Sequence, residues 1–169
     1  MMDNNQYILK PAQFAFIIFS IFIAFILNIF PNYDRYIWMP DILVLTILFW
    51  AIREPYKINI GTAFILGLLM DIKYGNLLGE TAIFYIVTIF LGLIMQRRLM
   101  QFSFIIQALH LLPILLISHG IIWLMHYFQG QLVSNIYWIK PAIQIVLWPI
   151  LSNILVLPQK FHEKLNNKI

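Results

Sequence analysis

The chain has 169 residues, of which 62% are hydrophobic and 11% charged, and its mean hydropathy is +0.83. Charged residues make up about a quarter of an ordinary soluble protein, so this composition excludes a soluble domain and indicates an integral membrane protein. A membrane-spanning helix needs about 20 apolar residues, so the length allows roughly five to seven spans and excludes a large additional catalytic domain.

Six apolar stretches, separated by charged or helix-breaking residues, predict an all-α fold of about six membrane-spanning helices in a single transmembrane domain, residues 1–169. The second and third stretches are short, and the third must extend into its flanks or be covered by neighbouring helices. If these two form one re-entrant pair, the chain has five spans. The predicted spans are 11–30, 37–52, 58–71, 80–96, 102–128 and 137–157.

Prolines mark several features of these spans. Pro11 suits the first turn of the first helix. Pro113 is expected to kink the fifth span and to free a carbonyl group that a histidine, Ser118 or Gln107 would satisfy. Pro149 is expected to bend the sixth span, and Pro158 to begin a tail after it.

Basic residues predict the orientation. If both termini face the cytoplasm, eight of the 11 basic residues lie on the cytoplasmic side, and the positive-inside rule therefore favours this arrangement. The same rule accounts for the net charge of +4, so we expect no nucleic-acid partner. The cytoplasmic residues are Lys10, Arg53, Lys57, Arg97, Arg98, Lys160, Lys164 and Lys168, and the outer ones are Arg35, Lys73 and Lys140.

Asp41 follows Pro40 at the start of the second span. An aspartate there can cap the helix by accepting backbone N–H bonds and complementing the helix dipole. The alternative is a polar anchor for another helix or for a partner protein, because a carboxylate near lipid is costly unless it is paired.

Glycines and an acid recur at every fourth position: Gly67, Asp71, Gly75 and Gly79. On one straight helix these positions share a face suited to close helix packing. We favour a helix that ends near Asp71, with Gly75 and Gly79 shaping a turn, because Lys73 and its neighbours are typical of a membrane interface. Asp71 then forms either a local salt bridge or loop hydrogen bond, or a polar centre that holds the third and fourth spans together.

Catalytic and metal-binding patterns are missing from the sequence. There is no cysteine, nucleophile elbow, H-E-x-x-H motif or glycine-rich phosphate loop. His110, His119 and His126 are spaced so that they do not meet on one helix face, which argues against a metal site. Asp41 and Asp71 lack the context of a protease dyad. We therefore expect no enzyme, no metal and no cofactor.

Amide and hydroxyl side chains in the last two spans are expected to form interhelical hydrogen bonds. They are Gln107, Gln144, Ser152 and Asn153. Because Gln144, Trp148 and Ser152 lie four residues apart, the sixth span should present one mixed polar and aromatic face.

Four groups of residues, taken together, resemble the MreD family of rod-shape-determining bacterial membrane proteins, in particular its proteobacterial branch. The order, spacing and total length carry the resemblance, and the Gly-Leu-Leu-x-Asp segment is its most diagnostic part. The groups are Trp38-Met39-Pro40-Asp41 followed by Phe49-Trp50 and Arg53; Gly61 and Gly67-Leu68-Leu69-Met70-Asp71 followed by Gly75 and Leu78-Gly79; Arg97-Arg98; and Tyr137-Trp138-x-x-Pro141 followed by Trp148-Pro149.

The resemblance implies a six-helix protein of the bacterial inner membrane with a fold similar to the substrate-binding subunits of vitamin transporters. It implies an adaptor without catalysis that acts with MreC, the actin-like MreB, RodA and the elongation transpeptidase in lateral peptidoglycan synthesis.

Two hypotheses of function follow. The first is a non-enzymatic scaffold that binds the membrane helix of MreC and positions wall synthases, in contact with membrane lipid. Its candidate structural and partner-binding residues are Pro40, Asp41, Gly67, Asp71, Gly75, Gly79, Trp148 and Pro149. The second is a subunit of an uptake transporter that binds a vitamin-like molecule, with Asn28, Gln107, Gln144 and Asn153 as candidate pocket residues.

Overall fold

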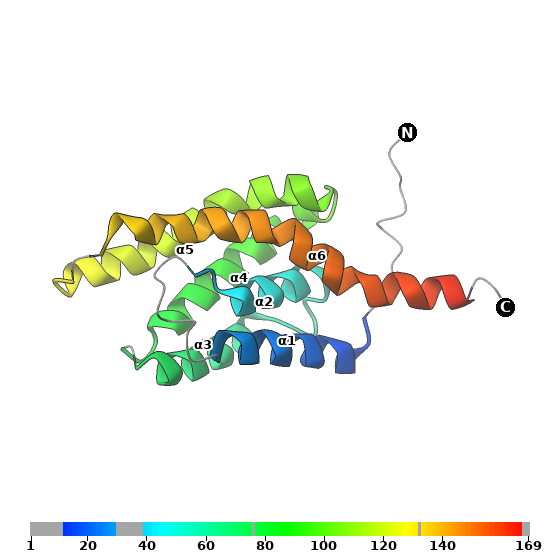
Figure 1. Ribbon diagram of the computed structural model, residues 1–169, viewed down its shortest axis with the longest axis horizontal. Helices are drawn as coiled ribbons and strands as arrows, with labels where there is room; N and C mark the ends of the chain where they lie inside the picture. Colours follow the sequence, from blue (N-terminus) through cyan, green and yellow to red (C-terminus); the bar gives the residue numbers. More distant parts are fainter. Residues whose placement is uncertain (1–11, 30–38, 76, 132, 167–169) are drawn as a thin grey trace.

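A computed structural model describes residues 12–29, 39–75, 77–131 and 133–166, with side chains described as far as Pro158. Over these ranges the chain is helical and contains no strand, so the predicted all-α class is confirmed there. The helices pack side by side in a bundle (Figure 1). They are α1 (Phe14–Ile29), α2 (Ile42–Arg53), α3 (Ile60–Tyr74), α4 (Glu80–Leu99), α5 (Phe104–Phe128), the 3-10 helix η3 (Asn135–Trp138) and α6 (Ile139–Asn166).

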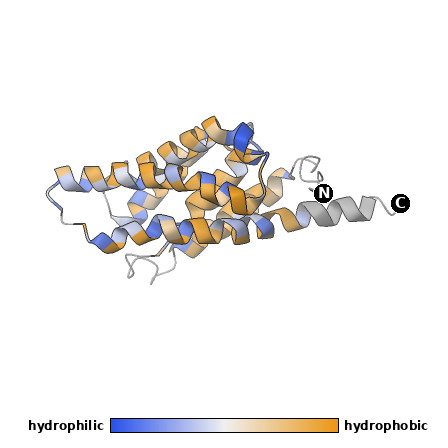
Figure 2. Cartoon of the chain, turned by 90° about the horizontal axis from the view of Figure 1, so that it is seen from above, coloured by the Kyte–Doolittle hydropathy of each residue, from blue (hydrophilic) through white to orange (hydrophobic). Residues whose placement is uncertain are grey.

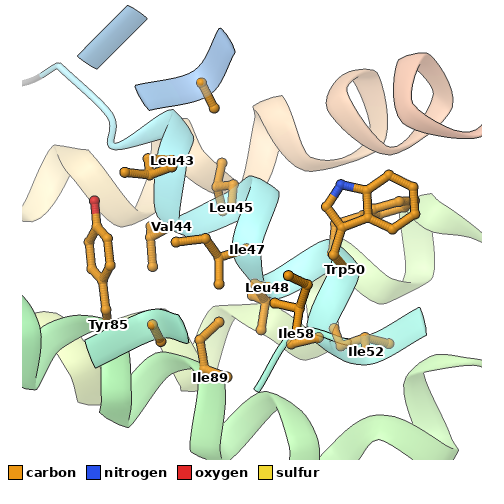
Figure 3. Packing of buried hydrophobic residues seen from close by; sticks show 14 of the residues in the cluster. Leu43, Val44, Leu45, Ile47, Leu48, Trp50, Ile52, Ile58, Tyr85 and Ile89 are labelled. Carbon is orange, nitrogen blue, oxygen red and sulfur yellow. The ribbon is translucent and has the colours of Figure 1, made fainter. Parts of the chain in front are cut away.

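Helix α2 occupies the centre of the bundle. Every residue from Leu43 to Ile52 is buried, and α1, α4 and α6 pack around the helix. Val44, Ile47 and Leu48 point toward Tyr85 and Ile89 of α4 (Figure 3). A helix of 12 residues is about 18 Å long, which is shorter than the hydrocarbon core of a bilayer. Protein rather than lipid covers this short helix.

The outer surfaces of the peripheral helices are apolar. Half of α1 consists of exposed large hydrophobic side chains, and α3, α5 and α6 carry similar faces. Hydrophobic residues predominate along most helices in Figure 2. Three stretches among the described residues are long and apolar enough to cross a membrane: Glu80–Leu99, Phe104–Phe128 and Asn135–Pro158. The shorter apolar helices are α1 and α2.

Hydrogen bonds hold the start of α1 against the end of α2. The backbone N–H of Ala12 donates to Glu54 Oε1 at 2.9 Å, and Lys57 Nζ donates to the carbonyl of Ala12 at 2.8 Å. Further along, Trp50 Nε1 of α2 donates to Ser20 Oγ of α1 at 2.8 Å. The two helices therefore run antiparallel, which brings the end of α1 to the start of α2.

Several predicted boundaries shift. Helix α2 begins at Ile42 and places Asp41 at its N-cap, and α3 begins at Ile60 and continues three residues past Asp71. Helix α4 continues to Leu99. Some residues used in the sequence predictions lie outside the described part of the chain: Lys10, Pro11, Arg35, Trp38 and Lys168. The two ends of the predicted first span and the start of the second also lie outside it, as do the side chains of Lys160 and Lys164.

Two expectations about prolines are wrong. Pro158 does not begin a tail, because α6 continues through it to Asn166; a proline removes one backbone hydrogen bond but need not end a helix. Near Pro113, the carbonyl of Leu109 gains none of the expected partners. Ser118 Oγ donates to Ile114 O at 2.9 Å, and His119 Nδ1 lies 2.9 Å from Leu115 O. Each of these side chains bonds the carbonyl four residues before it. That carbonyl is closer to the side chain than the carbonyl of Leu109, which the proline frees.

Candidate functional site

Asp71 caps the helix that follows its own. It lies near the end of α3 with 1% of its surface exposed. Its Oδ1 accepts the backbone N–H of Thr81 at 2.6 Å, and its Oδ2 accepts those of Gly79 at 2.8 Å and Ala82 at 3.4 Å. The first N–H groups of a helix have no partner within the helix. The buried carboxylate of α3 supplies these partners to α4 and also complements the positive end of its dipole.

Gly67 lies one turn before Asp71 and lets the same helix end approach. A Cβ placed on Gly67 would lie 2.9 Å from the backbone nitrogen of Ala82 and 3.1 Å from the carbonyl oxygen of Thr81, and closer still to the Cα of Ala82. These atoms belong to the backbone of α4, so a side chain at position 67 has no room unless α4 moves.

Gly75 and Gly79 form the turn between the two helices. Gly75 ends α3 with φ +65°, and Gly79 precedes α4 with φ +106°, both in the left-handed region that favours glycine. The favoured prediction of a turn is therefore confirmed, although α3 ends at Tyr74 rather than near Asp71. We call Gly67, Asp71, Gly75 and Gly79 the α3–α4 latch.

Both alternatives for Asp71 describe parts of what the structure shows. The carboxylate accepts a loop hydrogen bond from Gly79 and also bonds the start of α4, so it joins the third and fourth helices. Lys73 extends elsewhere, with its Nζ donating to the carbonyl of Asn28 at 3.0 Å.

Asp41 caps α2 and also joins two other helices. Its Oδ1 accepts the backbone N–H of Val44 at 3.0 Å and the side-chain amide of Asn28, from α1, at 2.6 Å. Its Oδ2 accepts the hydroxyl of Tyr85, from α4, at 2.7 Å. Both interpretations of Asp41, the helix cap and the anchor for other helices, describe parts of the same arrangement.

Two more helices reach this point. Gln144 of α6 donates to the carbonyl of Asp41 at 3.4 Å, and Lys73 of α3 donates to Asn28. Pro40, which precedes the cap, is buried. We call Asn28, Asp41, Lys73, Tyr85 and Gln144 the Asp41 cluster. It joins α1, α2, α3, α4 and α6 at the end of the bundle where α2 begins.

Tyr85 and the contact made by Lys73 are not predicted from the sequence. Tyr85 is surrounded by apolar residues in the sequence, and its hydroxyl gives no periodic signal. Asn28 was noticed, but as a possible pocket residue. A signal was available for it, because a buried amide at the end of an apolar helix needs a polar partner.

The polar face predicted for the sixth span is buried in α6. Trp148 Nε1 donates to Gln107 Oε1 of α5 at 3.3 Å, and the Trp148 ring lies 6.2 Å from that of Phe49 in α2. The predicted interhelical bonds form for Gln107 and Gln144. Among the described residues, Ser152 Oγ and Gln144 Oε1 are buried without a hydrogen-bond partner, and Asn153 bonds Pro149 O of its own helix at 2.8 Å. Within this part of the chain, Ser152 and Asn153 therefore do not form the predicted interhelical bonds. Pro149 lies within the continuous helix.

The three histidines lie in different surroundings. His110 stacks on Phe102, and His119 meets the ring of Phe84 edge-on at 4.7 Å. His126 Nε2 lies 2.8 Å from Glu80 Oε1, a contact between α5 and α4 that the sequence analysis missed. Within the described ranges, no three histidine, aspartate or glutamate side chains form a group able to hold a metal ion.

The candidate pocket residues do not surround a common space. Asn28 and Gln144 both bond Asp41, Gln107 bonds Trp148, and Asn153 is exposed on α6. The carboxylates of Asp41 and Asp71 accept bonds from separate sets of donors. These polar groups join helices, and their arrangement suits holding a bundle together.

Comparison with known proteins identifies the family. The sequence model described as rod shape-determining protein MreD matches residues 10–157. The chain belongs to the MreD family. The rod shape-determining protein MreD of Haemophilus influenzae is 40% identical over 70 residues, which are 40% of this chain and 43% of that protein. This match thus spans less than half of the relative. No solved structure matches the chain.

The Asp41 cluster makes a testable prediction for this MreD-family protein. Tyr85→Phe removes the hydroxyl that donates to Asp41 Oδ2 and keeps the buried ring, so we expect the free energy of unfolding to fall by about 0.5–1.5 kcal/mol. Unfolding of the purified protein in detergent measures the change. Tyr127→Phe, on an exposed ring of α5, is the matched control and should change stability by less than about 0.5 kcal/mol. Equal stability of both variants and the parent would contradict the assigned bond.

Proposed function

We propose that this MreD-family protein is a non-enzymatic scaffold of the bacterial cell-elongation machinery, required for rod shape and for lateral peptidoglycan synthesis. It binds the membrane helix of MreC and so positions RodA and the elongation transpeptidase, with MreB reached through MreC. Membership of the MreD family is the observation that carries this proposal.

The proposed architecture is a single domain that crosses the bacterial inner membrane six times, with both termini in the cytoplasm and a fold similar to vitamin-transporter binding subunits. The antiparallel contacts of α1 with α2 support alternate crossings. The burial of α2 supports a short span shielded by protein. The excess of basic residues in the proposed cytoplasmic segments supports the orientation.

The buried polar groups bond other parts of the bundle, and this supports a scaffold rather than an enzyme. In the described part of the chain, Asp41 and Asp71 accept hydrogen bonds from helix ends and neighbouring side chains. A general acid, base or nucleophile must instead face a substrate. The polar groups that hold this bundle together leave its apolar outer faces to meet lipid or a partner helix.

The candidate residues would act on the partner through the packing of the bundle. Gly67 and Asp71 are buried, and so are Pro40 and Trp148. A partner helix therefore meets the surfaces that these residues hold in place. Under this proposal, Asp41, Gly75, Gly79 and Pro149 also shape the site rather than touch the partner.

Depletion in the native cell tests the proposed function. We expect depleted rods to become round. Co-purification tests the partner separately: MreC should co-purify with the parent protein but much less with Asp71→Ala. Ile72→Ala, on the exposed neighbour of Asp71, is the matched control and should retain MreC. Rods of unchanged shape would contradict the proposal, and a nutrient-uptake defect in those cells would favour the transporter alternative.

A further inference from the structure

One polar side chain lies on an otherwise apolar outer surface. Away from the helix ends, the uncharged amide and hydroxyl side chains of the described helices are buried or partly buried, except that of Asn153, which is exposed on α6. Its neighbours on the same face are Val146, Ile150, Ile154 and Leu157, each between 56% and 67% exposed. This set, with Asn153, is called the α6 outer face.

The amide of Asn153 is only partly satisfied within the chain. One N–H donates to the carbonyl of Pro149 at 2.8 Å. The second N–H and the carbonyl oxygen have no partner among the described residues. An asparagine amide offers two donors and an acceptor with two lone pairs, so the exposed Asn153 retains both a donor and an acceptor.

Asn153 lies within the apolar part of its span. The apolar stretch of 24 residues ends at Pro158. Asn153 is five residues before that end, about 7–8 Å along the helix axis. Lipid tails offer no hydrogen-bond partner there, so a neighbouring protein helix that offers one is favoured over lipid at this position.

A second copy of this chain is able to supply that partner at the right depth. Both copies insert with the same orientation, so a two-fold axis along the membrane normal places their Asn153 residues at equal depth. An amide is self-complementary because each can donate to the other. A single asparagine among large aliphatic residues is a known way to fix the pairing of two helices. The spacing of the α6 outer face, at 146, 150, 153, 154 and 157, is that of a helix packing surface.

We propose that the α6 outer face is a homodimer interface, in which the Asn153 amides of two copies hydrogen-bond to each other. This interface does not depend on the proposed binding of MreC. It leaves the α3–α4 latch and the Asp41 cluster inside each copy.

Cysteine cross-linking in native membranes tests the interface, because the chain has no cysteine of its own. Ile150→Cys and Ile154→Cys should each give an oxidised dimer of about 40 kDa, twice the chain mass of 20.0 kDa. Phe19→Cys, on the exposed face of α1, is the matched control and should remain monomeric.

A second substitution tests the amide itself. Adding Asn153→Leu to Ile150→Cys should weaken dimerisation about threefold to tenfold, whereas Asn153→Gln should retain it. An unchanged melting temperature shows that the variants fold. Cross-linking no greater than that of Phe19→Cys would overturn the proposal, as would a cross-linked product containing a different protein. Dimerisation unaffected by Asn153→Leu would also overturn it.

Discussion

Replacing Asp71 by alanine is expected to lower the free energy of unfolding by about 3–5 kcal/mol. The carboxylate is 1% exposed and accepts three backbone N–H groups at the start of α4. Alanine leaves these buried and partly buried donors without their acceptor. Reversible unfolding of the purified protein in detergent or bilayers measures the loss, and the α4 N-terminus should become more accessible to hydrogen exchange.

Two control variants make this result specific. Asp71→Asn keeps one oxygen acceptor in the same shape, so its loss should be smaller, about 1–3 kcal/mol. Ile72→Ala changes a side chain that is 69% exposed and should cost less than about 1 kcal/mol. If Asp71→Ala were as stable as Ile72→Ala, the capping role would be wrong.

Enlarging Gly67 should be nearly as damaging. Gly67→Ala is expected to cost about 2–4 kcal/mol, and Gly67→Val more, because a Cβ there meets the backbone of α4 and the helices must separate. The same unfolding measurement applies. Because Gly67 and Asp71 contact the same helix end, a variant that carries both substitutions should lose less stability than the sum of the two single losses.

Gly120→Ala is the matched control for the glycine prediction. The nearest atom to a Cβ at Gly120 belongs to Trp138 at 3.9 Å, an ordinary van der Waals distance. Alanine also favours a helix, so this change should be neutral or should stabilise the protein by about 0.4–1 kcal/mol. Equal losses at positions 67 and 120 would show that close approach of α3 and α4 does not explain the need for glycine.

The sequence predicted the helical class and the turn because both depend on local signals. Long apolar stretches must be helical in lipid, and Gly75 and Gly79 mark a change of direction. The partners of Asp41 and Asp71 were harder to predict. The sequence indicates that both carboxylates need hydrogen-bond partners. Which donors they meet depends on which helix ends come together in the fold.

Contacts between distant residues account for what the sequence did not predict. Tyr85 reaches Asp41 across 44 positions, and Lys73 reaches Asn28 across 45. Hydropathy also does not distinguish a central helix from a peripheral one, since α2 is buried on all sides whereas α1, whose sequence is more apolar still, has an exposed face. The helix end predicted at Pro158 was wrong because a proline in the sequence does not by itself show whether the helix continues past it.

Surface labelling of single cysteines tests most directly the central claim that the chain crosses the membrane six times with both ends inside. We expect a membrane-impermeant maleimide to label Leu77→Cys and Ser134→Cys in intact cells, because the proposed orientation puts the α3–α4 and α5–α6 connections outside. Tyr56→Cys and Gln101→Cys should be labelled only after the membrane is opened. Labelling of all four positions from the same side would contradict the account.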